Sequence, residues 1–92
     1  MVHVLVKQKV KDYNTWLGGF NGHNDARKSA GQIKGSVYAN PKDNNEVFIL
    51  FEWDNIENMH NFMNSDELKS VMKEFSASPP EVTVMEKKSD FN

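Results

Sequence analysis

Two side chains capable of acid–base and anion chemistry lie four residues apart in the first third of the sequence. In a helix, His23 and Arg27 share one face, and Trp16 and Phe20 precede them on it. Histidine titrates near neutral pH, so His23 can take or give a proton. Arginine presents a fixed fork of donors, which suits a carboxylate or enolate oxygen. We therefore expect a cavity with an apolar body, made by Trp16 and Phe20, and a polar end, made by His23 and Arg27.

A third candidate for acid–base chemistry, Glu52, interrupts a run of apolar residues. Burying a carboxylate between two aromatic neighbours is costly unless the carboxylate is paired. Glu52 therefore either pairs with Arg27 or His23, or acts as a general base. A structural alternative to a catalytic role stays open for each residue. For Glu52, it is a salt bridge at a sheet edge or a dimer interface. For Arg27, it is a position near solvent, paired with Glu52 or Asp25.

Three further polar side chains are candidates for contact with a ligand. The hydroxyl of Tyr38 either reaches the ligand or ends a strand at the surface. His60 lies beside methionines on the predicted inner face of a helix, where a lone histidine is more often a core residue than part of a site. His3 shares a strand face with Leu5 and points either to the cavity or to a dimer contact.

The sequence predicts neither a metal site nor a bound cofactor. Cysteine is absent, which excludes thiolate ligands, thiol nucleophiles and disulfides. The three histidines, His3, His23 and His60, match no spacing of metal ligands. There is also no phosphate-binding glycine loop and no dinucleotide fingerprint. Any chemistry is therefore expected to come from the side chains and the substrate.

The hydrophobic pattern predicts the elements that must position these residues. Alternating apolar and polar residues indicate strands, and apolar residues three and four apart indicate helices. Asp12 is the expected N-cap of the first helix, and Asp54 with Glu57 resembles a capping box at the start of the second. The expected elements are, in order, a strand over Val2–Val10, a helix over Tyr13–Ser29, strands over Ile33–Asn40 and Glu46–Trp53 joined by a turn, a helix that opens at Asp54 and restarts at Ser65, and a strand over Glu81–Lys87.

The order βαββαβ predicts a ferredoxin-like α+β fold, an antiparallel sheet with both helices on one face, in a single domain over residues 1–92. The strand over Glu46–Trp53 is mostly apolar on both faces, because Phe48 and Leu50 alternate with the core residues. Helices can cover only one face. We expect the other face to meet the same face of a second copy, forming a homodimer. The alternative is that the C-terminal tail or a loop covers Phe48 and Leu50.

Composition and charge exclude several classes of partner. The chain is 38% hydrophobic and 26% charged, which is typical of a folded domain. No apolar run approaches the roughly 20 residues of a membrane span, and the N-terminal alternation differs from a signal peptide. We therefore expect a cytoplasmic protein without a membrane partner. An RNA-recognition module shares the element order, but the net charge is −2 and the strand over Glu46–Trp53 has no basic residue, so no nucleic-acid partner is expected.

The stretch from Glu46 to Met72 resembles small proteins related to the antibiotic biosynthesis monooxygenases, some of them cyclases, and the run from Asp12 to Arg27 resembles a subgroup of these. The two segments cover most of the chain. The resemblance implies a dimeric α+β barrel whose cavity, between sheet and helices, takes an aromatic or polyketide-like molecule. Haem-degrading relatives have a Trp and a His where this chain has Phe62 and Met72, and an Asn on the first strand that is missing here. The resemblance therefore does not imply haem chemistry.

Two functions fit these observations. The first is a cofactor-independent monooxygenase or cyclase, in which His23 moves a proton and Arg27 stabilises the developing oxyanion. The alternative is a non-catalytic ligand-binding or regulatory homodimer with the same cavity. Both predict a small-molecule ligand, so turnover of that ligand is the observation that separates them.

Overall fold

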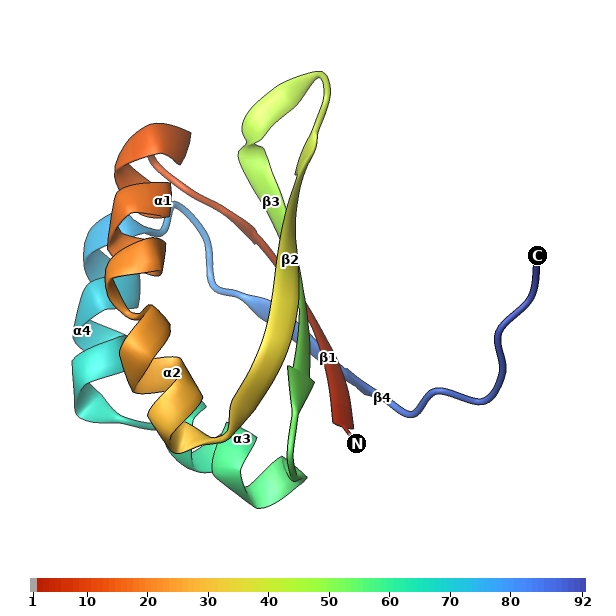
Figure 1. Ribbon diagram of the computed structural model, residues 1–92. Helices are drawn as coiled ribbons and strands as arrows, with labels where there is room; N and C mark the ends of the chain where they lie inside the picture. Colours follow the sequence, from red (N-terminus) through yellow and green to blue (C-terminus); the bar gives the residue numbers. More distant parts are fainter. Residues whose placement is uncertain (1) are drawn as a thin grey trace.

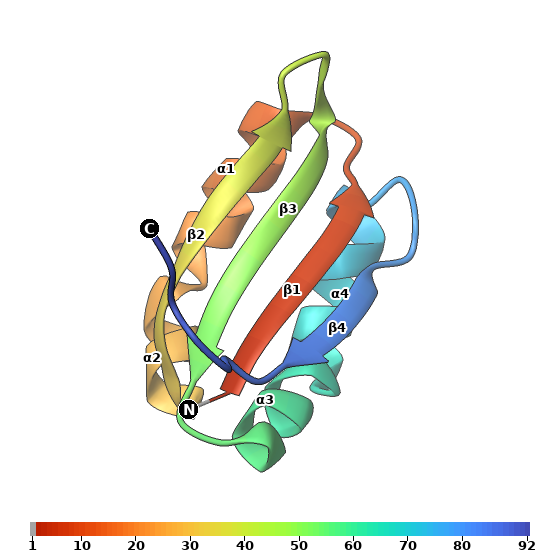
Figure 2. The ribbon, with the colours of Figure 1, turned by 90° about the vertical axis from the view of Figure 1, so that its right-hand side faces the viewer.

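The computed structural model describes residues 2–92 and consists of one antiparallel sheet with helices packed against one of its faces (Figure 1). The strand order is β2-β3-β1-β4, so the first and third strands are central (Figure 2). This confirms the predicted ferredoxin-like α+β fold. The elements are β1 (Val2–Lys9), α1 (Tyr13–Gly22), α2 (Asn24–Ala30), β2 (Gln32–Asn40), β3 (Asp43–Trp53), α3 (Ile56–Met63), α4 (Asp66–Phe75) and β4 (Glu81–Met85).

Alternation along the two central strands separates a buried face from an open one. One set of side chains points to the helices and forms the core, together with Trp16 from α1 and Met59 from α3. The alternate set points away from every helix, because successive side chains of a strand lie on opposite faces. The core residues of the central strands are Val4, Val6, Val47, Ile49, Phe51 and Trp53, and the apolar residues of the open face include Leu5, Phe48 and Leu50.

The helix expected over Tyr13–Ser29 is wrong in one respect, because it breaks at His23 into α1 and α2. His23 has φ −96° and ψ 7°, and its N–H donates to the carbonyl of Phe20 at 3.2 Å, a tightened last turn. Helical bonding resumes when Arg27 N–H donates to the carbonyl of His23 at 3.0 Å. Gly22 stands at the break, where its low helix propensity weakens the helix. The chain therefore turns slightly between the two segments without leaving the sheet face.

The second predicted N-terminus is also displaced by one residue. Asn55, not Asp54, caps α3, since its side chain accepts from the N–H of Asn58 at 2.8 Å. Asp54 instead accepts from the N–H of Asn55 at 2.7 Å and from the side-chain amide of Asn58. The expected cap at Asp12 is present, and Ser65, where the helix was expected to restart, caps α4; each accepts a backbone N–H three residues ahead.

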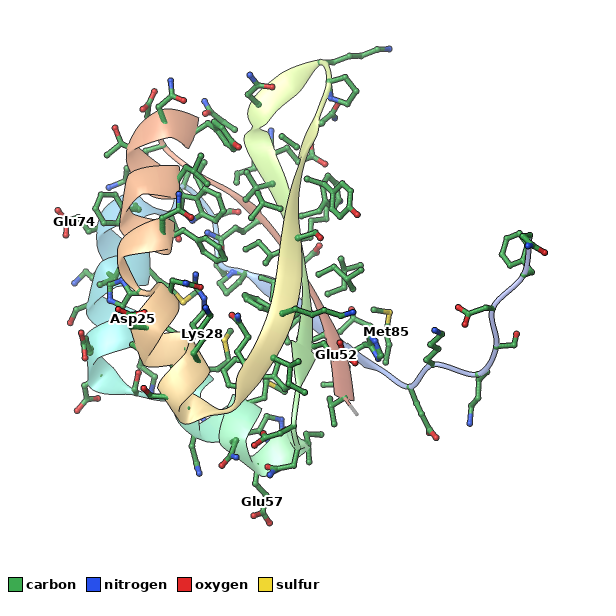
Figure 3. The ribbon with its side chains drawn as sticks, viewed as in Figure 1. Asp25, Lys28, Glu52, Glu57, Glu74 and Met85 are labelled. Carbon is green, nitrogen blue, oxygen red and sulfur yellow. The ribbon has the colours of Figure 1, made fainter. Side chains whose placement is uncertain are left out.

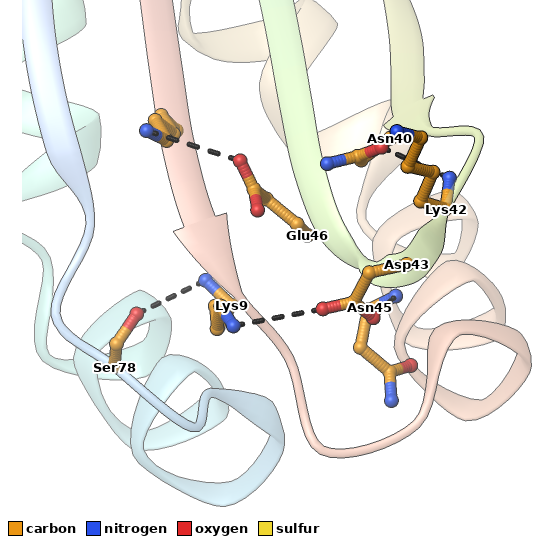
Figure 4. A network of polar contacts seen from close by, with 8 residues as sticks. Lys9, Asn40, Lys42, Asp43, Asn45, Glu46 and Ser78 are labelled. Carbon is orange, nitrogen blue, oxygen red and sulfur yellow. Dashed lines mark hydrogen bonds and ion pairs between the residues drawn. The ribbon is translucent and has the colours of Figure 1, made fainter.

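The β2–β3 hairpin is tighter than the turn expected over residues 41–45, because β3 begins at Asp43. The side chain of Asn40 accepts from Lys42 N–H, and that of Asp43 accepts from Asn45 N–H, so two Asx turns replace an open loop (Figure 4). Lys9 joins this hairpin to the chain before β4: its Nζ lies 3.5 Å from Asp43, and its N–H donates to Ser78 Oγ at 3.0 Å.

The chain beyond β4 runs out from the open face of the sheet (Figure 1). β4 ends at Met85 rather than the expected Lys87, and the side chain of Phe91 is 98% exposed. The tail therefore does not bury its aromatic residue against Phe48 or Leu50. Within residues 2–92 the longest helices have ten residues, and none is long and apolar enough to cross a bilayer.

Candidate functional site

A cavity of about 70 Å³ lies between the helices and the buried face of the sheet. Its walls come from β1, β3, α1, α2, α3 and α4, and they are almost entirely apolar. Four polar side chains interrupt them: Gln8, His23, Arg27 and Ser76. The apolar walls include Trp16, Phe20, Phe51, Phe62, Met63, Leu68, Val71, Met72 and Phe75. Apolar walls with a few polar groups are the usual composition of a small-molecule site.

Stacked aromatic rings form one wall of this cavity. Trp16 and Phe20 lie one helical turn apart on α1, and their ring centres are 5.0 Å apart with an interplanar angle of 27°. Phe20 then meets Phe51 of β3, with ring centres 6.1 Å apart. Helix periodicity places the first pair on the sheet side, as the sequence predicts. A flat aromatic molecule would extend this stack.

Arg27 is buried at the polar end of the cavity, with 5% of its surface exposed. Its Nε donates to Gln32 Oε1 at 2.8 Å, and its Nη1 donates to the carbonyl of Phe20 at 2.7 Å. Burial lowers the pKa of the Arg27 guanidinium from its ordinary value, because the charged form loses hydration. The expected partners do not pair with it: Asp25 is exposed on α2 (Figure 3), and Glu52 lies across the sheet.

His23 stands at the break between α1 and α2, on the cavity wall facing α4. Its Nδ1 lies 3.1 Å from the carbonyl oxygen of Gly19, which can only accept, so Nδ1 carries a proton. Nε2 is therefore the ring nitrogen that the backbone does not engage. Its neighbour is Glu67 Oε1 of α4 at 3.6 Å, and the Glu67 side chain is largely exposed. This arrangement suits a proton exchange between a bound molecule, His23 and solvent.

Gln8 and Ser76 complete the polar lining, and sequence reasoning missed both. Gln8 is 6% exposed, and its side-chain amide donates to Ser76 Oγ at 3.1 Å. Gln8 lies on the same face of β1 as Val4 and Val6. A polar residue among the apolar residues of that face is the sequence feature that could have identified it. Its amide lies beside the space that His23 and Arg27 also border.

Glu52 lies on the open face of the sheet, so the expected pairing with His23 or Arg27 does not form. The reason is strand alternation: Phe51 beside it faces the cavity, and Glu52 must face away. Figure 3 shows Glu52 on the side of the sheet opposite the helices. Its carboxylate lies 3.9 Å from Nε2 of His3 and 3.7 Å from Nζ of Lys34. This also places His3 on the open face, one of its two expected positions.

Tyr38 and His60 lie outside the cavity as well. Tyr38 is 57% exposed on the open-face side of β2, where it pairs across the hairpin with Phe48. His60 is exposed on α3, which corrects the expected inner-face position. Met59 is the buried residue of α3, and one residue further along a helix is a rotation of about 100°, which turns His60 outward. Within residues 2–92, no group of three or more metal-ligating side chains gathers in one place.

No protein-family model matches the sequence, and no curated protein matches it. Solved structures do match the fold. A candidate antibiotic biosynthesis monooxygenase from Bordetella bronchiseptica superimposes with a TM-score of 0.80 at 17% identity, over 96% of this chain and 97% of that one. A second candidate, from Deinococcus radiodurans, gives 0.69 at 16% identity, over 100% and 97%.

SnoaB, a cofactor-independent oxygenase from Streptomyces nogalater, also matches. It superimposes with a TM-score of 0.73 at 8% identity, over 97% of this chain and 94% of that one. At such low identity the likeness concerns the backbone and not the chemistry. The resemblance stated from the sequence is confirmed at this level: the chain has the fold of the antibiotic biosynthesis monooxygenases.

Proposed function

We propose that this protein binds a small aromatic or polyketide-like molecule in the cavity and acts on it as a cofactor-independent monooxygenase or cyclase. The observation that carries the proposal is that His23 and Arg27 border the same apolar cavity as the Trp16–Phe20 stack. The shared fold of SnoaB, a cofactor-independent oxygenase, supports it.

The residues of the cavity suit proton removal from a phenol or enol. The aromatic stack holds the flat body of the substrate. Nε2 of His23 takes the proton, and the guanidinium of Arg27 stabilises the oxyanion that develops. Such an anion is electron-rich and can reduce dioxygen directly. In an oxygenation, a ring CH2 and O2 then give a ring C=O and water, and the substrate supplies all the electrons.

Accommodating an aromatic substrate requires movement of the cavity walls. The cavity volume of about 70 Å³ is about half of the roughly 150 Å³ that accommodates benzene in a protein core. The wall formed by α4 is the one suited to move, since α4 contains no fully buried residue. Its apolar side chains Leu68, Val71, Met72 and Phe75 line the cavity.

The proposed working form is a homodimer that joins the open faces of two sheets. Leu5, Phe48 and Leu50 form an apolar centre on this face, with Met85 beside them on β4. The helices lie on the other face, and the C-terminal tail leads away from the sheet (Figure 1). An uncovered apolar sheet face of this kind marks an interface.

Turnover of 1,4-naphthalenediol, an aryl quinol, tests the catalytic proposal. We expect oxygen uptake above the buffer blank, with 2-hydroxy-1,4-naphthoquinone, which carries one inserted oxygen atom, identified by mass spectrometry. Formation of 1,4-naphthoquinone and hydrogen peroxide alone would show oxidation without oxygenation and would contradict the monooxygenase proposal. His23→Ala should lower the rate by about 100-fold, the size of a typical general-base effect. His60→Ala, an exposed histidine outside the cavity, is the matched control and should keep the wild-type rate. A working substrate on which His23→Ala matches wild type would show that His23 has no such role.

The second candidate is a non-catalytic ligand-binding or regulatory dimer, and the small volume of the cavity favours it. A ligand that binds only the folded protein raises the melting temperature whether or not it is converted. Thermal shifts across a panel of quinols, each paired with product analysis, therefore separate the candidates. Stabilisation without product identifies the binding protein.

A further inference from the structure

Arg27 is a buried cation without an acidic partner. It is 95% buried, and no carboxylate within residues 2–92 lies in ion-pair distance of its guanidinium. Both of its acceptors, the Gln32 side-chain amide and the Phe20 carbonyl, are neutral. Each of them engages one nitrogen of the fork, so N–H donors remain on a guanidinium that has five. Buried charges in proteins are normally paired, so a guanidinium whose protein partners are all neutral favours an anionic ligand.

Arg27 borders two hollows at once, which gives its free donors a route to a ligand. One is the apolar cavity, which it shares with Phe20 and Phe51. The other is an open groove of about 420 Å³ between α2 and the edge strand β2. Phe20 and Phe51 line the groove as well, so both hollows meet around these rings and the guanidinium.

The groove has a positive lining. Lys28 of α2 and Lys34 of β2 line it with Arg27, and the other polar residues are amides and a serine. No aspartate or glutamate lines it within the described chain. Lys34 pairs with Glu52 on the open face of the sheet, its Nζ 3.7 Å from that carboxylate, so Arg27 and Lys28 supply the unpaired positive charge of the groove. A concave surface with one sign of charge concentrates ligands of the opposite sign.

We propose that the ligand of this site is an aromatic carboxylate whose anionic group binds Arg27 from the α2–β2 groove, with its ring directed to the Phe20–Trp16 stack. The proposal rests on the proposed function in taking the cavity as the ligand site, and it adds the charge of the ligand and its path of entry. The carboxylate supplies the counter-charge that the chain itself lacks. Arginine is suited to this role because its planar fork matches a carboxylate.

A structural role for Arg27 is the competing interpretation. Its guanidinium carbon lies 3.7 Å from the centre of the Phe20 ring, and a cation over a ring face is attracted to it. If this contact and the two hydrogen bonds satisfied the charge, the site would not prefer an anion over a neutral molecule of the same shape.

Two pairs of isosteric probes decide between these interpretations: benzoate with benzamide, and 1-naphthoate with 1-naphthamide. Dissociation constants are measured by calorimetry and by quenching of tryptophan fluorescence, since Trp16 lines the cavity. For at least one pair we expect the carboxylate to bind about tenfold or more tightly than the amide. Equal affinities in both pairs, or no binding of either carboxylate up to about 10 mM, would overturn the proposal.

Substitutions test whether Arg27 causes the preference for the carboxylate over the amide. Arg27→Met should abolish the difference between acid and amide, and Arg27→Lys should keep part of it, because the charge stays while the fork is lost. Lys42→Met, on the exposed hairpin turn, is the matched control and should keep all of it. A preference that survives Arg27→Met overturns the assignment to Arg27. If Arg27→Met does not fold, the wild-type acid–amide comparison and Arg27→Lys still decide.

The results separate this inference from the proposed function. Amides that bind as tightly as acids, together with turnover of a quinol, would remove the charge requirement and leave the catalytic proposal standing. Acids that bind preferentially, with no turnover of any substrate, would do the reverse.

Discussion

The guanidinium of Arg27 lies 3.7 Å from the centre of the Phe20 ring, and the same guanidinium donates to the carbonyl oxygen of Phe20. The two residues belong to different helical segments, one on each side of the break at His23. Arg27 therefore closes the turn between α1 and α2 from the cavity side. The same Arg27–Phe20 contacts therefore hold the helix break at His23 and form the polar end of the cavity.

The first prediction concerns stability without ligand. Replacing Arg27 by Met removes two hydrogen bonds from a charged donor, each contributing about 1.5 kcal/mol or more, and one cation–ring contact of about 1 kcal/mol. It also removes the cost of burying an unpaired charge, which is of several kcal/mol. We expect the free energy of unfolding of Arg27→Met in urea to be unchanged or up to about 2 kcal/mol higher. A loss of more than about 2 kcal/mol would instead identify Arg27 as a structural residue.

The second prediction compares two neighbouring glycines of α1. A Cβ at Gly18 meets no atom within 4 Å, whereas a Cβ at Gly19 lies 3.2 Å from the Phe75 ring of α4. Gly18→Ala should raise the free energy of unfolding by about 1 kcal/mol through helix propensity alone. The increase in the free energy of unfolding should be at least about 0.5 kcal/mol smaller for Gly19→Ala than for Gly18→Ala, because Phe75 must shift. Equal gains in urea unfolding would mean that α4 yields freely at Phe75.

The third prediction concerns acid stability and Asp12, the N-cap of α1. Hydrogen bonds from the backbone N–H and then the side-chain hydroxyl of Thr15 lower the pKa of Asp12 below its ordinary value. A lowered pKa means that the ionised cap stabilises the fold above the unfolded-state pKa of about 3.9 and loses this effect as the pH falls through the folded-state pKa. Asp12→Asn keeps a cap that does not titrate.

Melting temperatures of wild type and Asp12→Asn, measured from about pH 6 down to pH 2, check this assignment. We expect wild type to have the higher melting temperature near the upper pH, and we expect the difference from Asp12→Asn to disappear at the acidic end of the range. An advantage that stays constant over the whole range would show that the Asp12 charge contributes nothing to the helix.

Local periodicity was sufficient to predict most of the fold. The alternation in β1 and β3 identifies both faces of the sheet correctly, including the outward position of Phe48 and Leu50. The break at His23 was missed because residues four apart stay on one side of the chain through a single tightened turn. Trp16, Phe20, His23 and Arg27 therefore reach one cavity although the helix is not continuous.

The polar lining of the site was harder to predict, because it depends on which elements meet. Ser76 follows α4 and contacts Gln8 of β1 across 68 positions of sequence, a pairing that no local pattern indicates. The expected contact of Glu52 with Arg27 was at odds with the same alternation that places Phe51 in the core. Strand alternation, and not the attraction between opposite charges, decides on which face Glu52 lies.

The last prediction tests the proposed dimer at Leu50, which stands at the middle of the open face opposite Leu5 of β1 and Ser36 of β2. We expect wild-type protein at micromolar concentration to sediment with twice the mass of one chain. Leu50→Asp should shift it to the monomer, because a carboxylate at the centre of a desolvated interface has no partner. Ile56→Asp changes an equally apolar residue that is 41% exposed on α3, and it should leave the dimer intact. A monomeric wild type would refute the proposed interface. Because Leu50 faces away from the cavity, that result would not contradict the proposed site at His23 and Arg27. A dimer that withstands Leu50→Asp would place the interface on another surface of the chain.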